Sequence, residues 1–232
     1  AILGSATAEV AAKIIATALP YAAQSLQSSE DQIRFEDGLF IVENTNHSID
    51  LEDLVKTLAV AGQPHLLNIS HSYETAGATY PYGCHIAEVE IDPASCTVAL
   101  ERFTVVDDFG LVINPQMLAG QIHGGIAQGV GQALFEHVVY DDEGQILSGS
   151  FLDYAMPRAD HFPPLDIHMR NTPCQNNVLG IKGSGEAGAI GAPQAVVGAV
   201  CDALDIRHVD MPVTPQKIFD ILHNRQAGTE AE

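Results

Sequence analysis

The sequence is poor in basic residues. It contains 10 lysines and arginines against 30 aspartates and glutamates among 232 residues, which gives a formal net charge of −20 at pH 7. A chain this acidic lacks the positive surface that binds nucleic acid or anionic membranes. An acidic surface is also common among proteins of many kinds, so the charge excludes classes of partner and assigns no function by itself.

Cysteine is scarce and dispersed. The four cysteines are Cys84, Cys96, Cys174 and Cys201, with no C-x-x-C spacing. A zinc or iron–sulfur site built from this chain alone is therefore not expected, and reduced thiols in a cytoplasmic protein are the default interpretation. The 10 histidines are scattered and form no H-E-x-x-H motif, so no metal-ligating residue is predicted.

Long apolar runs are also missing. Residues 1–19 are apolar and rich in alanine, but Glu9 and Lys13 interrupt them. We therefore predict a helix that runs from near Ser5 into the twenties and is kinked or ended by Pro20, with no membrane span and no signal peptide.

The elements that are present are mixed. Asp37-Gly38 lies between two short apolar runs and predicts a β-hairpin. Asp50 is placed to cap a short helix, and residues 66–73 are predicted as a strand. Alternating apolar and polar residues in 85–91 and 97–106 predict an antiparallel pair with one exposed face.

Two adjacent acids, Asp107 and Asp108, follow this pair. They suggest metal ligands, but a solvated turn is the commoner role for such residues. With a later hairpin and further helices, we predict an α+β fold with helices packed on mixed, largely antiparallel sheets. Residues 1–225 form a single domain or two closely packed lobes, 1–113 and 114–225, and 226–232 form a disordered tail.

A glycine-rich helix is predicted after Asn114-Pro115, which supply a cap and a first-turn proline. Residues 116–136 contain five glycines, and each costs about 1 kcal/mol relative to alanine in a helix. Two pairs of glycines lie four residues apart, each pair on one face: Gly120 with Gly124, and Gly125 with Gly129. Either a neighbouring helix or a large rigid ligand would explain such faces. Gln121 and Gln128 also share a face, and their amides need partners if they are buried.

The segment Lys182–Pro193 holds four glycines and a single acid, Glu186. Pro193 suits a first helical turn, so we expect the following helix to begin after Gly191. A dinucleotide-binding loop fits the G-x-G-x-x-G pattern, but the late helix start and a carboxylate beside the phosphates argue against it. A structural turn with a solvated Glu186 and a general base held beside a cofactor are the other two interpretations.

Three motifs carry a resemblance to a known family. They are Gly120–Gly129 (GQIHGGIAQG), Gly149–Arg158 (GSFLDYAMPR) and Lys182–Gly188 (KGSGEAG). Together they resemble the molybdenum-binding large subunit of the xanthine dehydrogenase family, nearest to the bacterial branch of aerobic carbon monoxide dehydrogenase large subunits. The resemblance covers nearly the whole chain but only the C-terminal portion of such subunits, which are several times longer. It implies the molybdenum-cofactor-binding domain of a molybdenum hydroxylase.

The resemblance also implies a cofactor and residue roles. The cofactor is molybdenum–pyranopterin in the molybdopterin cytosine dinucleotide form, and a small substrate is oxidised with water-derived oxygen. Glu186 takes the position of the general base to the molybdenum-bound hydroxide. The residues implied to contact the cofactor lie on the glycine-rich helix and the glycine-rich segment: Gln121, Gly124, Gly125, Gln128, Lys182, Gly183, Ser184 and Gly185. Ser184 departs from many members, which carry a small apolar residue there.

The implied partners are the upstream part of the large subunit, a medium subunit that binds FAD and a small subunit with [2Fe-2S] clusters. Such enzymes are expected to form a dimer of heterotrimers in the cytoplasm, without nucleic acid and without membrane insertion. The present chain is expected to be inactive alone. The alternative hypothesis is a nucleotide-binding or assembly module that uses the Gly183–Gly188 loop without redox activity. The substrate is not indicated, because the pocket residues that select it would lie upstream.

Overall fold

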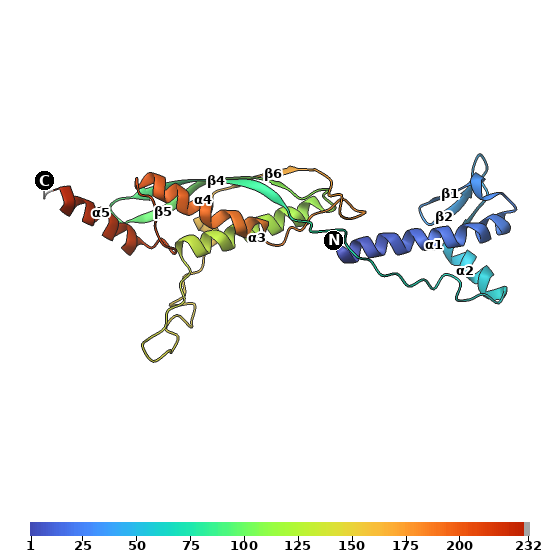
Figure 1. The fold of residues 1–232 in the computed structure, drawn as a ribbon, viewed down its shortest axis with the longest axis horizontal. Coiled ribbons are helices and arrows are strands. Elements are labelled where there is room, and N and C mark those ends of the chain that lie inside the picture. Colours follow the sequence, from blue (N-terminus) through green and yellow to red (C-terminus); the bar gives the residue numbers. More distant parts are fainter. Residues whose placement is uncertain (230–232) are drawn as a thin grey trace. The chain divides into compact units, whose positions relative to one another are not determined.

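The computed structural model describes residues 1–229 and divides the chain into two compact units, which are described separately (Figure 1). The first unit comprises Ala1–Ala78 and Gln175–Leu179, and the second comprises Thr79–Cys174 and Gly180–Glu232. The boundary after Ala78 lies earlier in the sequence than the boundary predicted between the lobes 1–113 and 114–225. The reason is that the strands following residue 79 pack with the helices that come later in the chain.

The first unit combines two helices with a small sheet. Its elements are α1 (Ile2–Leu26), the short 3-10 helix η1 (Glu30–Gln32), β1 (Ile33–Glu36), β2 (Leu39–Val42), β3 (Ser48–Asp50) and α2 (Leu51–Val60). The sheet is antiparallel, with β2 between β1 and β3. The core of the unit is formed by Ala18, Ala22, Phe40, Leu54 and Leu58.

Turn and cap signals in this unit are confirmed. Asp37 and Gly38 have φ values of 50° and 81°, as a tight hairpin turn requires. Asp50 caps α2, because its Oδ1 accepts a hydrogen bond from the main-chain N–H of Asp53 at 2.6 Å.

Two other predictions for this unit are corrected by the structure. Pro20 does not end helix α1, which reaches the twenties as predicted and continues to Leu26. Pro20 lies on the exposed side, where water can satisfy the carbonyl that its missing N–H leaves unbonded. Residues 66–73, all within the described part of the chain, form no strand. The main-chain N–H groups of Leu66 and Asn68 instead close local turns.

Helix α1 also bears on the membrane prediction. By length and composition, it is the one helix among residues 1–229 that could cross a bilayer. The expectation that the chain has no apolar segment long enough to span a membrane was therefore wrong. Length and composition do not separate a membrane span from other apolar helices, so the absence of membrane insertion stays a prediction.

The second unit is a three-stranded mixed sheet with helices. Its elements are β4 (Tyr82–Asp92), β5 (Thr97–Asp108), α3 (Pro115–Leu134), η2 (Ala159–His161), β6 (Leu165–Arg170), α4 (Ala187–Ala203) and α5 (Pro215–Thr229). The central strand β5 pairs antiparallel with β4 and parallel with β6. Helices α3 and α4 run together along one face of this sheet (Figure 1). The α+β prediction is confirmed.

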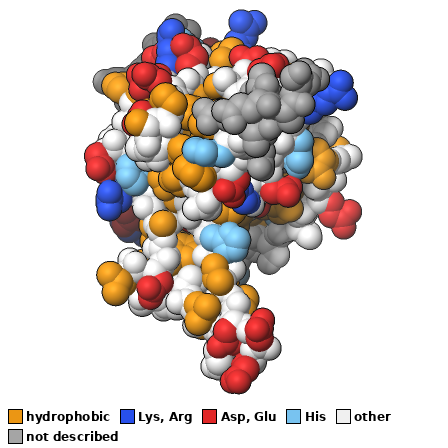
Figure 2. Space-filling view, turned by 90° about the vertical axis from the view of Figure 1, so that its left-hand side faces the viewer, with side chains coloured by type: hydrophobic (Ala, Val, Ile, Leu, Met, Phe, Trp, Pro, Cys, Tyr) orange, Lys and Arg blue, Asp and Glu red, His pale blue; other side chains and the backbone are white. Residues whose placement is uncertain are grey.

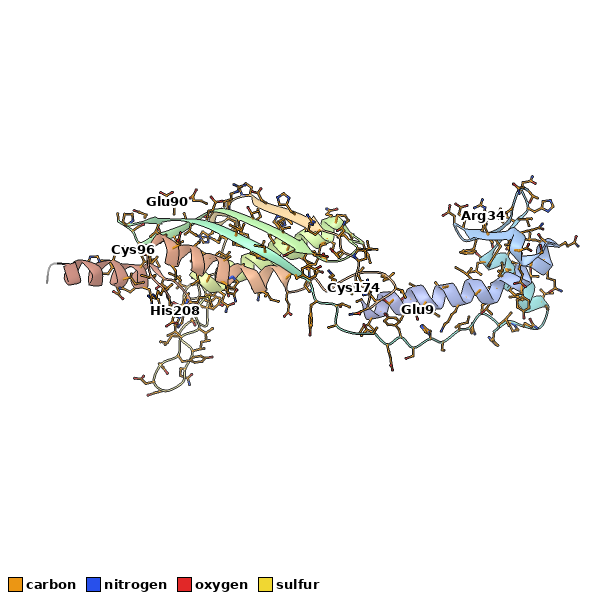
Figure 3. All side chains as sticks on the ribbon, turned by 45° about the horizontal axis from the view of Figure 1, so that its top comes forward. Glu9, Arg34, Glu90, Cys96, Cys174 and His208 are labelled. Atoms are coloured by element: carbon orange, nitrogen blue, oxygen red, sulfur yellow. The ribbon has the colours of Figure 1, made fainter. Side chains whose placement is uncertain are left out.

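The free cysteines do not gather in this unit. Cys96 lies in the turn between β4 and β5, and Cys174 lies after β6, toward the other end of the sheet (Figure 3). At the C-terminus, α5 extends to Thr229, so residues 226–229 of the predicted tail are helical. Residues 230–232 lie outside the described part of the chain.

One segment, residues 138–156, projects from the second unit (Figure 1). A bridge between Tyr140 and Ile146 confirms the hairpin at its tip. Hydrophobic side chains are exposed along it and acidic ones gather at its end (Figure 2). Phe151 and Leu152 are 84% and 93% exposed.

Candidate functional site

The glycine loop, residues 182–186, is tied to the sheet where it begins. The main-chain N–H of Lys182 donates to the carbonyl of Phe109 at 2.8 Å, just beyond the end of β5. The next N–H, of Gly183, donates to the carbonyl of Thr79 at 2.8 Å. The entry of the loop is therefore held by main chain that flanks β4 and β5.

Helix α4 begins earlier than predicted. Its first residue is Ala187 and its N-cap is Glu186, so the predicted start after Gly191 was wrong. Pro193 lies inside the helix, where a Cβ added to Gly129 of α3 would come within 2.9 Å of its ring. Pro193 thus packs against α3 from inside α4, whereas the sequence signal places a proline in the first turn of a helix.

Glu186 stands at the exposed N-terminus of α4. Its side chain is exposed and makes no hydrogen bond to the first turn. Two residues later, Gly188 is buried against α3, where an added Cβ would lie 2.6 Å from the carbonyl oxygen of Ile122. The carboxylate is therefore presented beside the contact between α3 and α4, at the end of a helix that favours negative charge.

Lys182 is engaged in a buried ion pair. Its Nζ lies 2.9 Å from Asp108 Oδ1, and the two side chains are 7% and 3% exposed. The same Nζ lies 4.1 Å from the centre of the Tyr82 ring. Burial alone would lower the pKa of Lys182, but the hydrogen bonds to Asp108 and Tyr82 raise it above its ordinary value. Burial would also raise the pKa of Asp108, yet hydrogen bonds from Thr172, Gly110 and Lys182 hold it well below its usual range.

The neighbouring acid, Asp107, faces the other side of the strand end, because side chains alternate along a strand. It is 3% exposed, and its Oδ1 lies 3.4 Å from His85 Nε2. Glycines give this pair its space: an added Cβ on Gly83 would overlap Asp107, and one on Gly191 would lie 2.7 Å from His85 Nδ1. The solvated turn predicted for Asp107 and Asp108 was wrong, since both acids are buried.

Three buried polar atoms here lack a hydrogen-bond partner within residues 1–229: His85 Nδ1, Asp107 Oδ2 and Asp108 Oδ2. Among the same residues, no group of three or more histidine, cysteine, aspartate or glutamate side chains is placed to hold a metal ion.

One face of α3, called here the packed face, is formed by Gly125 and Gly129. An added Cβ on Gly125 would lie 2.9 Å from the Cα of Gly188, and one on Gly129 would lie 2.8 Å from the Cβ of Ala192. These glycines let α3 and α4 approach closely, as the packing interpretation requires. Gly125 is therefore covered by α4 within this chain.

The other glycine face of α3, called here the open face, consists of Gly120, Gln121, Gly124 and Gln128. All four residues are exposed. An added Cβ on Gly120 or Gly124 would meet no atom within 4 Å. Close packing inside the described chain therefore does not explain these two glycines.

A cavity of about 510 Å³ lies between the start of α3, the turn after β5 and the glycine loop. Its lining is mostly apolar, and its polar side chains are Asn114, Gln121, Lys182 and Ser184. Three of the predicted cofactor contacts are thus brought to one cavity. Gly183, Gly185 and Glu186 continue along the same loop, whereas Gln128 lies further along α3.

Sequence reasoning missed the polar surroundings of the loop, which are the exposed Tyr82 and the buried side chains of His85, Asp107 and Asp108. One feature of the sequence could have indicated a buried carboxylate near Lys182. The chain has only 10 basic residues, and Lys182 follows the apolar run ending at Ile181. A lysine in such a position needs a carboxylate partner if it is buried.

Comparisons of the sequence and of the structure with known proteins indicate the same family. Residues 1–163 match the molybdopterin cofactor-binding domain family. The chain is 37% identical over 207 residues to the nicotine 6-hydroxylase large subunit of Paenarthrobacter nicotinovorans, covering 85% of this chain and 25% of that protein. It is 31% identical over 232 residues to the carbon monoxide dehydrogenase large chain of Hydrogenophaga pseudoflava, covering 96% and 29%. The solved structure of reconstituted CO dehydrogenase from Oligotropha carboxidovorans superposes with a TM-score of 0.82 at 27% identity, covering 98% and 29%. The chain thus spans less than a third of the length of these proteins.

Proposed function

Because the chain belongs to the molybdopterin cofactor-binding domain family of molybdenum hydroxylases, we propose that it forms the C-terminal part of a catalytic subunit that oxidises a small substrate with water-derived oxygen. Glu186 is the general base in this proposal. The two named relatives are a large subunit and a large chain, which supports a role within a longer polypeptide. The nucleotide-binding or assembly alternative has no comparable support.

The observation that carries the proposal is the placement of Glu186. Its carboxylate is exposed at the N-terminus of α4, directly after the glycine loop, and Gly188 fixes the same turn against α3. A base must reach its proton without rearrangement of the backbone. Glu186 meets this need, because its main chain is held on the helix side while its side chain is uncovered.

The residues present fit a large rigid cofactor. The open face of α3 has room at Gly120 and Gly124, and the amides of Gln121 and Gln128 are exposed beside them. Gly185 also has nothing within 4 Å of an added Cβ. Glycine-lined surfaces and free amides suit a planar, polar pterin, which needs close backbone approach and hydrogen-bond partners.

The molybdenum centre, when bound, supplies the oxidation, and the residues of this chain supply binding and proton uptake. Gln121 and Gln128 would hold polar edges of the cofactor through their amides. Gly183, Ser184 and Gly185 would bring main chain close to it, and none of the hydrogen bonds within residues 1–229 uses the N–H groups of Ser184 and Gly185. Glu186 would accept the proton on its carboxylate. Gly124 would set the distance of closest approach on α3.

The proposal also covers the form of the cofactor, the location of the enzyme and its partner subunits. We infer the cytosine dinucleotide form of the cofactor, a cytoplasmic enzyme, and partner subunits that carry FAD and [2Fe-2S] clusters in a dimer of heterotrimers. The names of relatives support a multi-subunit complex, since one is subunit gamma of the 6-hydroxypseudooxynicotine dehydrogenase complex of Paenarthrobacter nicotinovorans. Electron transfer to such partners would need no metal cluster in this chain.

The test is Glu186→Gln in the complete enzyme. This change keeps the size of the side chain and removes its basicity. We expect turnover to fall by roughly 100- to 10,000-fold, the usual contribution of a positioned base, while molybdenum and pterin contents stay unchanged. Glu90→Gln is the matched control, because Glu90 is exposed toward the far end of β4 from Tyr82 and the loop. Full turnover in Glu186→Gln would refute the assigned role.

A further inference from the structure

We propose that Asp108 is a positioning residue whose ion pair with Lys182 locks the glycine loop and thereby fixes where Glu186 is presented. The inference deepens the proposed function and rests on it for the role of Glu186. It assigns Lys182 to the placement of the loop, where the family resemblance implied contact with the cofactor.

Asp108 joins three segments of the chain through one oxygen. Its Oδ1 accepts hydrogen bonds from the N–H of Gly110 at 2.8 Å, the N–H of Thr172 at 3.3 Å and Nζ of Lys182 at 2.9 Å. These donors come from the turn after β5, the segment after β6 and the start of the glycine loop. A single carboxylate therefore holds the loop entry against both neighbouring strands of the sheet.

The burial of this pair makes it a strong constraint. Neither charge can move into water without opening the junction, because the Lys182 and Asp108 side chains are 7% and 3% exposed. Removing one partner would leave the other charge buried and unpaired, which is costly. The ring of Tyr82 beside Nζ further limits where the ammonium can lie.

Apart from the two main-chain hydrogen bonds at its entry, from Lys182 to Phe109 and from Gly183 to Thr79, little within the described chain holds the loop. An added Cβ on Gly185 would meet nothing within 4 Å. Glycines give the backbone wide conformational freedom. Glu186 thus lies between two anchors, the buried pair at the loop entry and the contact of Gly188 with α3. Loss of the first anchor would let the loop move while α4 stays packed.

A different ion pair in the same sheet offers a matched control. Arg102 of β5 and Asp166 of β6 lie 2.9 Å apart, but their side chains are 58% and 44% exposed. Asp166→Asn removes one carboxylate from the same sheet without touching the loop. Exposed pairs of this kind contribute little, so this variant should behave like the unaltered protein.

The experiment compares Asp108→Asn, Lys182→Met and the double variant. Melting temperature and hydrogen exchange of residues 180–186 are measured on the 232-residue chain, and kcat, KM and molybdenum content on the complete enzyme. Each single variant should melt lower, exchange the Lys182 and Gly183 amides about ten-fold faster or more, and lose roughly 100-fold in kcat at constant KM and molybdenum content. The double variant should regain much of the melting temperature, because no charge is left buried alone, yet keep fast exchange and low kcat.

The proposal is overturned if the double variant regains kcat together with stability, since the pair would then be only structural. Unchanged exchange in both single variants would also overturn it. The proposed function can fail separately: if Glu186→Gln turns over normally while the exchange results hold, the lock exists but does not serve a base.

Discussion

The two glycine faces of α3 use the same residue at the same spacing for different purposes. On the packed face, Gly125 and Gly129 lie against α4, and an added Cβ on either would come closer than 3 Å to its atoms. On the open face, Gly120 and Gly124 would meet nothing within 4 Å. Each glycine costs helical stability of about 1 kcal/mol, so the open face carries a cost that the described chain does not offset.

The two faces of α3 therefore have different roles, one in folding and one in the proposed function. The packed face is explained by the crossing of α3 and α4, which builds the core of the second unit. The open face lies on the side of Gln121, which reaches the same cavity as Lys182 and Ser184. We therefore attribute the packed face to folding and the open face to the proposed cofactor.

The largest effect is expected when the packed face is filled. Gly125→Val places a branched side chain where an added Cβ already lies 2.9 Å from the backbone of α4. Because backbone cannot give way as a flexible side chain can, we expect a loss of about 3 kcal/mol in the free energy of unfolding. Urea denaturation of the 232-residue chain would measure it. A loss smaller than that of Gly129→Ala would show that the contact of Gly125 with the backbone of α4 does not limit the size of the side chain there.

A smaller loss is expected for Gly129→Ala. The added methyl group would meet the Cβ of Ala192 at 2.8 Å and the ring of Pro193 at 2.9 Å. The higher helix propensity of alanine offsets part of the strain, so we expect a net loss of about 1 kcal/mol. Urea denaturation also serves here, and a gain in stability would show that the two helices separate easily.

The smallest effect has the opposite sign. Gly124→Ala adds a methyl group to the open face, where the structure leaves space. We expect the free energy of unfolding to rise by up to about 1 kcal/mol, while the complete enzyme retains less molybdenum and pterin. Gly198→Ala in α4 provides the control, because an added Cβ on Gly198 also meets nothing within 4 Å and this residue lies outside the open face. Full cofactor retention in Gly124→Ala would remove the functional explanation of the open face.

Local signals were predictable from the sequence. Asn114 caps α3 by accepting a hydrogen bond from the N–H of Met117 at 2.9 Å, and Pro115 is the first helical residue, as predicted. The strands of the β4–β5 pair were found from their alternation, and the Asp37-Gly38 turn from its residue types. These features depend on residues that are neighbours in sequence.

Features that depend on distant segments were missed. The start of α4 at Ala187 and the position of Pro193 inside it follow from packing against Gly129, which lies in another helix. The burial of Asp108 requires Lys182, which is 74 positions away. Adjacent acids at a strand end look like a solvated turn until such a partner is known.

In the proposed enzyme, the open face of α3 and the glycine loop together hold the cofactor next to the Glu186 carboxylate. A crystal structure of the complete, cofactor-loaded enzyme tests this arrangement most directly. We expect the cofactor to contact Gln121, Gly124 and the main chain of residues 183–185, with the Glu186 carboxylate directed toward the metal. A structure in which other polypeptide fills the open face, and Glu186 points into water away from the cofactor, would contradict it.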